Sequence, residues 1–445
     1  MSIGKVLRIL LTVFALLTFE ELCMADKISI VIENINKNRI DFELTNGLKV
    51  VLFNVNDAKT INTTIGFNAG SLYENKPGLA YLTAQSLVFK NKKYKMLEIP
   101  QIIESLGGSI TTSAGHDIST ITVKALYEDT ETVLLKVLDI LNGFEVDNEV
   151  LNILKPNIIS EIKVKDDDAW DFTRKTFLKE IYGDHPYGRE PEGDERGILS
   201  ITPDDIMTFF RNLYTPDNAV LVVVGKMNTN NLKKFIEEHF SKWTGKKKPM
   251  SAPEIRTKKD KKEVRINKNL KQSTIRLGHL STNIKDKNSM ELKILNFILG
   301  GGGFGSRLME RIREKEGLAY GVFSNFYIER TLNGYFFVGT QTENKNVSRT
   351  IDIITNEIKK IIEEGITDKE LEDTKNFSKG SLLLGMESFS TIASFLVSEK
   401  MFGLDKNYFI KDIQKISVIK KEDIQRVARE YIDINNLTIV IVGGE

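Results

Sequence analysis

The sequence predicts an α+β fold built from two duplicated halves, each with helices packed on a mainly antiparallel sheet. The main observation is a repeat. Residues 218–225 read Asn-Ala-Val-Leu-Val-Val-Val-Gly, and residues 436–443 read Asn-Leu-Thr-Ile-Val-Ile-Val-Gly. Each copy follows an amphipathic helix that ends near a tyrosine, Tyr214 or Tyr431. Because the helix, Tyr, Asn and Gly all recur 217 or 218 positions later, duplication is a better explanation than a chance match between apolar strands.

The order of elements is similar in the two halves. Asn46-Gly47 lies between two apolar runs in residues 42–52, which predicts a hairpin, because both central positions of the tightest hairpin turn favour these residues. Alternating or continuous apolar runs predict strands, and apolar residues three or four apart predict helices. In the first half these patterns give a strand at 61–67 and helices at 79–89, 96–106, 128–142 and 148–165. In the second half they give strands at 274–278, 322–329 and 334–341 and helices at 289–299 and 306–315.

Composition places the chain among globular proteins. It has 445 residues, of which 41% are apolar, with 62 Lys and Arg against 61 Asp and Glu, for a net charge of +1. A near-zero charge argues against a chain built chiefly to hold nucleic acid. The single cysteine excludes an intramolecular disulfide framework and a cysteine zinc cluster. The four histidines are widely separated in sequence, so a histidine-rich metal motif is absent.

Residues 1–25 predict a secretory signal peptide. Lys5 and Arg8 form a basic start, a largely apolar run follows to Phe19, and Cys23-Met24-Ala25 ends the segment before a candidate cleavage site. A membrane anchor is a weaker interpretation because the run is shorter than the ~20 residues of a spanning helix. A lipoprotein is weaker still, since Leu22 precedes the cysteine where a small residue is needed. We expect export to the periplasm or the extracellular space, with no membrane span left after removal.

A lysine-rich linker is predicted at residues 241–265, between an N-terminal half at 26–240 and a C-terminal half at 266–445. The segment holds nine residues of Lys or Pro between positions 246 and 262 and few apolar ones. Its alternative function is binding to a polyanion, but charge runs of this kind are more often solvated.

The run Gly300-Gly-Gly-Gly-Phe-Gly305 satisfies the G-x-G-x-x-G pattern of dinucleotide sites. Such a site also needs a strand directly before the run and an acidic residue about 20 positions later. The preceding residues have helical spacing instead, and position 325 is Asn. We therefore predict a flexible loop between two helices, which lets the backbone of Gly301, Gly302, Gly303 and Phe304 approach an extended peptide, or serves only as a hinge.

The sequence resembles a family over almost its whole length. It is similar to the pitrilysin/insulinase-like zinc peptidases, in particular the two-subunit form related to the mitochondrial processing peptidase. The most specific passages are Asn68-Ala-Gly-Ser-Leu-Tyr-Glu74, Pro77-Gly-Leu-Ala-Tyr81, Pro186-Tyr-Gly188 and residues 301–320. The resemblance implies a clam-like molecule of two related halves and the hydrolysis of short or unfolded peptides.

The family's zinc motif, His-x-x-Glu-His, is lost here. Its two histidines lie four apart on one helix face and bind zinc, while the Glu activates the bound water. On this sequence the motif falls on Tyr81, Ala84 and Gln85. The distal Glu ligand is retained as Glu161, 76 positions after Gln85, where it is expected to be an ordinary solvated residue. Tyr and Gln are poor zinc ligands and Ala accepts no proton, so we predict no metal in this chain.

A second family motif is intact. In the family, Arg and Tyr seven positions apart, in Arg-x-x-x-Gly-Leu-x-Tyr, reach the zinc site, bind substrate and stabilise the tetrahedral intermediate. Here the motif reads Arg313-Glu-Lys-Glu-Gly-Leu-Ala-Tyr320. The resemblance therefore implies that Arg313 and Tyr320 keep this role. Guanidinium and phenol groups are both donors suited to developing negative charge. Taken alone, Arg313 would be interpreted as an ordinary surface helix residue and Tyr320 as an aromatic residue at a strand edge.

Together these features predict a non-catalytic, substrate-binding subunit of an exported heterodimeric zinc metallopeptidase. A zinc-bearing sister subunit would complete a composite active site, and this chain would be inactive alone. The alternative is a catalytically inactive peptide-binding or scaffold protein of the same fold. An autonomous peptidase with altered ligands is the least favoured hypothesis.

Overall fold

The computed structural model describes residues 35–255 and 261–444, so the predicted signal peptide lies outside the described residues. The chain forms two compact units, and neither is one continuous segment. Unit 1 comprises the residues up to Ile159, Pro191–Ala252 and Leu384–Gln414. Unit 2 comprises Ser160–Glu190, Pro253–Leu383 and the residues from Lys415 onward.

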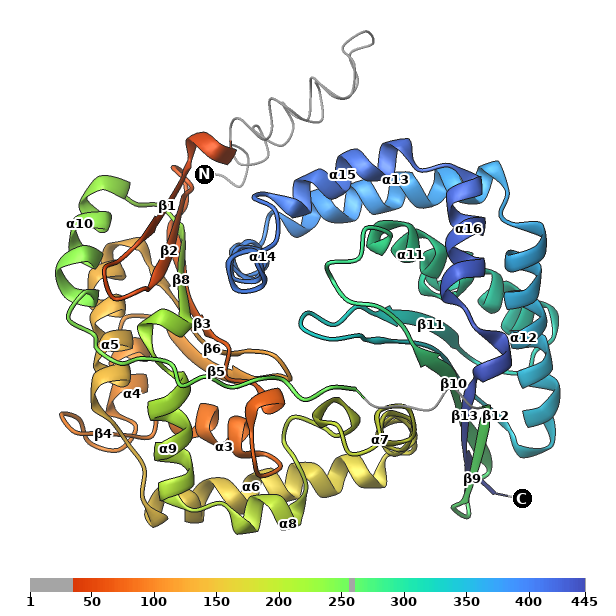
Figure 1. Ribbon diagram of the computed structural model, residues 1–445, viewed down its shortest axis with the longest axis horizontal. Coiled ribbons are helices and arrows are strands. Elements are labelled where there is room, and N and C mark those ends of the chain that lie inside the picture. The colour runs from red at the N-terminus through yellow and green to blue at the C-terminus, as the bar shows by residue number, and fades with distance from the viewer. Residues whose placement is uncertain (1–34, 256–260, 445) are drawn as a thin grey trace, which may run out of the picture. The chain divides into compact units, whose positions relative to one another are not determined.

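Unit 1 is built on a six-stranded sheet in the order β1-β2-β8-β3-β6-β5 (Figure 1). Its strands are β1 (Arg39–Glu43), β2 (Lys49–Asn54), β3 (Thr60–Phe67), β5 (Ser109–Ala114), β6 (Ser119–Leu126) and β8 (Ala219–Gly225). A separate two-stranded ribbon pairs β4 (Lys90–Asn91) with β7 (Phe144–Glu145). The predicted hairpin around Asn46-Gly47 is confirmed: β1 and β2 pair antiparallel, and Gly47 has a φ of 89° that favours glycine.

Helices cover this sheet. They are α3 (Leu79–Ser86), α4 (Glu98–Ser105), α5 (Thr130–Gly143), α6 (Asn148–Asp167), α8 (Glu195–Ser200), α9 (Pro203–Leu213), α10 (Thr229–Phe240), α14 (Phe389–Phe402) and α15 (Tyr408–Val418). The unit boundaries fall within α6 and α15. The amphipathic helix before the repeated strand, α9, begins with a capping box between Thr202 and Asp205, which satisfies backbone donors at its first turn.

Unit 2 repeats the plan with a five-stranded sheet in the order β11-β12-β10-β13-β9. Its strands are β9 (Lys262–Asn267), β10 (Gln272–Leu280), β11 (Val322–Tyr327), β12 (Tyr335–Glu343) and β13 (Thr438–Gly443). Its helices are α7 (Ala169–Tyr182), α11 (Ser289–Asn296), α12 (Val347–Glu364), α13 (Asp368–Gly385) and α16 (Lys421–Tyr431), with α13 extending over a unit boundary. The core holds apolar residues of β10, β12 and β13 together with α11, α12 and α16.

The pairing of the repeated strands supports the predicted duplication. In unit 1, β8 pairs parallel with β2 and antiparallel with β3. In unit 2, β13 pairs parallel with β9 and antiparallel with β10. Both sheets are mainly antiparallel, as expected. In each sheet the single parallel pair joins the repeated strand, β8 or β13, to β2 or β9.

Helices were expected on one face of each sheet, but each sheet also carries a helix on its other face. In unit 1, α14 contributes Ile392, Leu396 and Val397 to a cluster with the valines of β8 (Figure 1). In unit 2, α7 contacts β10 and β13, the counterparts of β3 and β8. Each of these helices comes from the other half of the sequence. Since both faces are covered, β8 is buried along its whole length, which explains its continuous apolar run.

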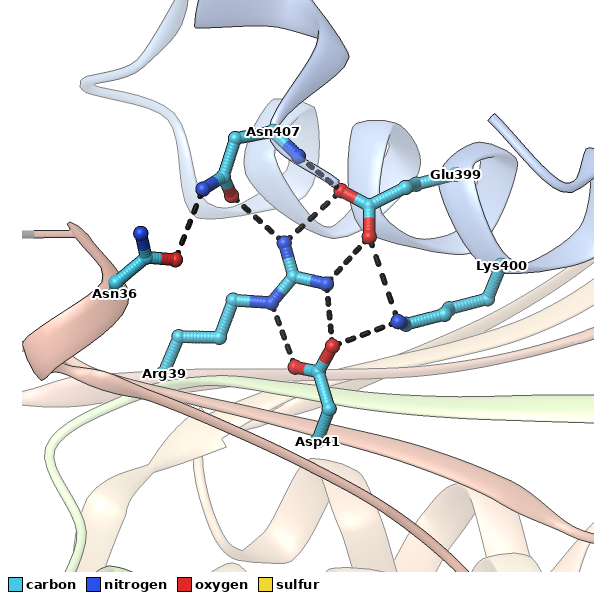
Figure 2. A network of polar contacts seen from close by, with 6 residues as sticks. All are labelled: Asn36, Arg39, Asp41, Glu399, Lys400 and Asn407. Carbon is cyan, nitrogen blue, oxygen red and sulfur yellow. Dashed lines mark hydrogen bonds and ion pairs between the residues drawn. The ribbon is translucent and has the colours of Figure 1, made fainter. Parts of the chain in front are cut away.

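A buried ionic network fixes α14 to the first strand of unit 1 (Figure 2). The guanidinium of Arg39 donates to Glu399 on α14 at 2.9 Å, to the side chain of Asn407 at 2.8 Å and to Asp41 at 2.6 Å. Lys400 adds an ion pair with Asp41 at 2.7 Å. The side chains of Arg39 and Glu399 are 0% and 1% exposed. Two cations thus face two carboxylates, so the network is neutral and its members satisfy one another.

We expect Gly66→Ala to weaken the docking of α14. A Cβ on Gly66 in β3 would lie 2.7 Å from Cγ1 of Val397 on α14, closer than carbon atoms approach without displacement. Overpacking of this kind costs about 1–3 kcal/mol, to be measured by urea unfolding. Gly115→Ala is the control, because the nearest atom to its Cβ would be 3.8 Å away. An equal loss in both variants would contradict the role of the Val397 contact.

Candidate functional site

The degenerate zinc positions lie on helix α3 in unit 1. Gly78, with a φ of 86°, precedes the helix, and the carboxylate of Glu74 accepts hydrogen bonds from the backbone of Gly78 at 3.0 Å and Ala80 at 2.9 Å. This carboxylate satisfies the amide groups at the helix start. Tyr81 and Gln85, four residues apart, are both half-buried on one side of the helix.

The residues at these positions do not fit a zinc ion. Ala84, at the position of the family's general base, is fully buried, so it has neither the carboxylate nor the exposure that water activation needs. Glu161 is exposed on α6, in the part of the chain that belongs to unit 2. Among the described residues no group of three or more His, Cys, Asp and Glu side chains is arranged to hold a metal.

We expect the purified chain to contain far less than one zinc ion per molecule by elemental analysis. The variant Tyr81→His with Gln85→His should bind zinc more tightly than the parent, because two imidazoles four residues apart on one helix face are a zinc-binding pair. Gln85→His alone is the matched control and should bind weakly. Stoichiometric zinc in the unaltered chain would contradict the loss of the site.

The glycine-rich run in unit 2 is a tightly wound turn rather than an open loop. A π-helical turn, Phe297–Gly301, continues α11, and a 3-10 turn, Gly303–Gly305, follows it. A Cβ on Gly300 would lie 2.6 Å from the backbone nitrogen of Ser324, so only glycine allows the turn to pack on β11. Gly301 and Gly303 are exposed, Gly302 is half-buried, and Phe304 is 66% exposed.

The segment after this turn is anchored by a paired arginine. Arg307 donates from Nε and Nη2 to the two carboxylate oxygens of Glu370 at 2.6 and 2.8 Å. Burial alone would raise the pKa of Glu370, but the hydrogen bonds from Arg307 and from Thr367 lower it to about 2. The pair therefore stays ionised at all physiological pH values and holds the start of the next helical segment.

Arg313 and Tyr320 lie beside each other at the end of this segment. Arg313 is in a second π-helical segment, Met309–Lys315. Gly317, with a φ of 62°, turns the chain. Leu318 then enters the core of unit 2. Its carbonyl accepts a hydrogen bond from Thr342 at 2.7 Å, which fixes the position from which Tyr320 projects.

The side chains of Phe304, Arg313 and Tyr320 form one surface cluster, in which the two rings are exposed and Arg313 is half-buried. We call it the arginine cluster. The guanidinium carbon of Arg313 lies 4.7 Å from the ring centre of Phe304 and 4.5 Å from that of Tyr320. Both are cation–π distances. Tyr320 is 85% exposed. The structure thus brings the predicted Arg/Tyr pair together with the aromatic residue of the glycine-rich turn.

Arg313, unlike its two charged neighbours, has no ion-pair partner among the described residues. Its neighbours Arg311 and Lys315 pair with Glu316 at 2.9 Å and Glu310 at 2.7 Å. Among the described residues Arg313 has no carboxylate within ion-pair distance, and its contacts are with the two rings. A half-buried guanidinium that is held between aromatic rings and has no ion pair can donate hydrogen bonds to a bound carbonyl or carboxylate.

One feature of unit 2 was missed by sequence reasoning. Arg276 is a buried cation in the middle of strand β10. Its signal was present in the sequence, because a charged residue stands between two apolar ones at Ile275-Arg-Leu277, in the middle of a predicted strand. Such a residue is rarely buried without a functional or ionic reason.

Comparison with known sequences finds two matching family patterns. That of Insulinase (Peptidase family M16) matches residues 49–194, and that of the Peptidase M16 inactive domain matches residues 200–377. A non-peptidase homolog, YmxG of Helicobacter pylori, is 28% identical over 385 residues, 84% of this chain and 87% of that protein. An uncharacterized zinc protease of Streptomyces coelicolor is 25% identical, over 87% of this chain and 86% of its own.

Solved structures share the fold. A peptidase M16 inactive domain from Pseudomonas fluorescens superposes with a TM-score of 0.86 at 23% identity, covering 92% of this chain and 98% of that one. A protease from Helicobacter pylori gives 0.85 at 23% identity, covering 91% and 99%. The periplasmic protease PqqL from Escherichia coli gives 0.79 at 15% identity, and the match covers 46% of that longer chain. In the described part of the chain, no helix has the length and apolarity needed to cross a membrane.

Proposed function

The chain belongs to peptidase family M16, the insulinase family, and we propose that it is the non-catalytic, substrate-binding subunit of a heterodimeric zinc peptidase. In this proposal a sister chain holds the zinc ion, and this chain supplies Arg313 and Tyr320 to the composite active site. The single observation that supports it most is an asymmetry. The zinc positions carry Tyr81, Ala84 and Gln85, while the arginine cluster is intact, lies at the surface and has no counter-ion among the described residues.

The proposed role of each group follows from its chemistry. The guanidinium of Arg313 and the phenol of Tyr320 donate hydrogen bonds to the carbonyl oxygen of the scissile peptide bond, whose negative charge grows during hydrolysis. Phe304 orients the guanidinium and offers an apolar contact to substrate. The exposed backbone of Gly301, Gly302 and Gly303 accommodates an extended peptide. The zinc of the partner supplies water activation, which this chain lacks.

The edges of the two sheets also suit extended peptides. One edge of each sheet is charged: β1 carries Arg39, Asp41 and Glu43, and β9 carries Lys262, Glu263 and Arg265. The opposite edges, β5 and β11, carry no charged residue and no proline. Natural proteins protect edge strands with charges and prolines, so an edge without them is suited to pairing with another chain.

The test is reconstitution. The chain is purified alone and together with a zinc-bearing M16 chain from the same organism, and both preparations receive a fluorescent unstructured peptide. We expect the chain alone to bind the peptide without cleaving it, and the mixture to cleave it in a chelator-sensitive way. Cleavage by this chain alone, or no gain over the zinc-bearing chain alone, would contradict the proposal.

A second candidate is a catalytically inactive peptide-binding or scaffold protein. It is supported by the relative that is named a non-peptidase homolog. The same experiment separates the two candidates, because a scaffold protein binds peptide but leaves the activity of every zinc-bearing chain unchanged.

We also propose that the protein is exported, on the basis of the signal-peptide pattern in residues 1–25. N-terminal sequencing of the natural protein should then begin at or near Asp26. An intact Met1 would contradict this proposal.

A further inference from the structure

The sheet of unit 2 carries a row of aromatic side chains on the face opposite its core, beside helix α7, whose Trp170 lies 5.5 Å from Phe323 between ring centres. Phe323 and Tyr327 of β11 are 40% and 42% exposed, and they contact Tyr335 and Phe337 of β12. Tyr335 and Phe337 are buried there, at 5% and 2% exposure, while the two residues of β11 remain accessible. Tyr327 stacks on Tyr335 with ring centres 4.8 Å apart. We call these four residues the aromatic face. Among the described residues, every aromatic side chain that is more than a third exposed lies in unit 2.

A buried cation lies next to this face. Arg276 in β10 is opposite Gly339 of β12 in the sheet register, and its guanidinium carbon is 4.1 Å from the ring centre of Phe337. The residue is 5% exposed, and neither Nε nor Nη1 has a hydrogen-bond partner in the described part of the chain. Burial lowers the pKa of Arg276 to about 10, which leaves it positively charged at neutral pH.

Glu190, the carboxylate that acts electrostatically on Arg276, binds another residue. Arg174 on α7 donates to Asp171 at 2.9 Å and to Glu190 at 2.8 Å. Glu190 is among the groups that act electrostatically on Arg276, but its ion pair is with Arg174. Tyr327 and Tyr335 also act electrostatically on Arg276, and the like charge of Arg174 opposes it. Arg276 is thus a cation next to a partly exposed aromatic surface, with no ion-pair partner in the described part of the chain.

An unpaired buried charge destabilises the folded chain, so a buried arginine in this position calls for a partner that compensates its charge. A carboxylate from outside the chain would satisfy it, because the guanidinium of Arg recognises carboxylates through paired hydrogen bonds. The residue as a whole keeps 5% exposure, although Nε and Nη1 themselves are enclosed. The exposed rings of Phe323 and Tyr327 would meanwhile cover apolar side chains of the same ligand.

We propose that the aromatic face binds an extended peptide segment and that Arg276 receives an acidic side chain of that segment. Alternate side chains of an extended peptide point to one side, roughly 7 Å apart. A Glu or Asp flanked at alternate positions by large apolar residues would therefore contact Arg276 and the rings together. This inference rests on the proposed peptide-binding function and adds a preference for acidic–apolar segments.

The test uses two amidated fluorescent peptides that differ only in a central Glu or Gln between large apolar residues. In anisotropy titrations of the full chain, we expect the Glu peptide to bind at least about 10-fold more tightly, the effect of a charge-assisted hydrogen bond. Arg276→Met should abolish the preference and leave the affinity for the Gln peptide unchanged. Tyr327→Ala should weaken the binding of both peptides.

Two controls keep the result interpretable. Arg276→Met should unfold at a temperature no lower than the parent, since it removes an unpaired buried charge while keeping the volume. Arg265→Met, in the charged edge strand β9 where Arg265 pairs with Glu263 at 2.7 Å, should retain the preference for Glu.

Four outcomes would overturn the inference. Equal affinity of the parent for both peptides, or a preference that survives in Arg276→Met, would show that Arg276 does not receive the acid, while peptide binding itself would stand. Tight binding of the Gln peptide once it carries a free C-terminal carboxylate would assign the site to chain ends instead of side chains. If neither peptide binds, the proposed peptide-binding function falls with the inference.

Discussion

Replacing Arg39 by Met should lower the free energy of unfolding by about 3–5 kcal/mol, as expected when one partner of a buried ion pair is removed. Glu399 would lose its main partner in a site where its side chain is 1% exposed. It would retain only the backbone amide of Asn407, 2.8 Å away, and the more distant ammonium of Lys400 at 3.5 Å. Urea unfolding followed by circular dichroism measures the change.

A double substitution shows whether the stability lost in Arg39→Met comes from the unpaired charge or from the change in side-chain volume. Arg39→Met with Glu399→Leu removes both ends of the pair, and we expect it to recover most of the lost stability, because two apolar side chains can replace a buried pair. Lys411→Met is the surface control. Lys411 pairs with Asp405 at 2.9 Å with both side chains exposed, so its loss should change stability by less than about 1 kcal/mol. A small effect of Arg39→Met would show that the network contributes little.

Arg313→Ala should reduce peptide hydrolysis by the reconstituted pair roughly 10²–10³-fold, the loss that follows removal of one donor to a developing oxyanion. The reduction should fall mainly on kcat, since the interaction strengthens in the transition state. The melting temperature of the chain should hardly change, because Arg313 is not part of an internal ion pair in the described residues.

Neighbouring residues provide matched controls for this prediction. Arg311→Ala removes a guanidinium from the same helical segment, but one that pairs with Glu316, and should leave turnover unchanged. Tyr320→Phe keeps the ring beside Arg313 and removes only the hydroxyl, so we expect a smaller loss than for Arg313→Ala. Unchanged turnover in Arg313→Ala would refute the composite active site.

Much of the fold could be predicted because local patterns determine it. The hairpin, the strand at β3 and the helices α3 to α6 all appear close to their predicted ranges. Strand β5 was not predicted, because its sequence Ser-Ile-Thr-Thr-Ser-Ala offers few large apolar residues. Residues 306–315 were expected to be an ordinary helix and contain a π-helical segment, since apolar spacing over two turns hardly distinguishes the two.

The sequence could not predict that α7 and α14 are exchanged between the halves, so that each packs on the sheet formed mainly by the other half of the chain. Apolar spacing in α14 shows that Ile392, Leu396 and Val397 are buried, but it does not show against which strand. The same limit applies to the site. The resemblance identified Arg313 and Tyr320 by position, yet the contact of Arg313 with both rings depends on the turn at Gly317 and on side-chain orientation.

The exchange of helices has a consequence for synthesis on the ribosome. The strands of unit 1 are complete at Gly225, but α14 does not emerge until residues 389–402 have been made. Until then the valine surface of β8, with Val220, Val222 and Val224, has no helix to cover it. The nascent chain therefore exposes an apolar sheet surface, which is prone to aggregation, while more than 160 further residues are translated. Chaperones that shield growing chains should accordingly be most needed in this interval, and a stop codon before α14 should yield aggregates rather than a soluble first half.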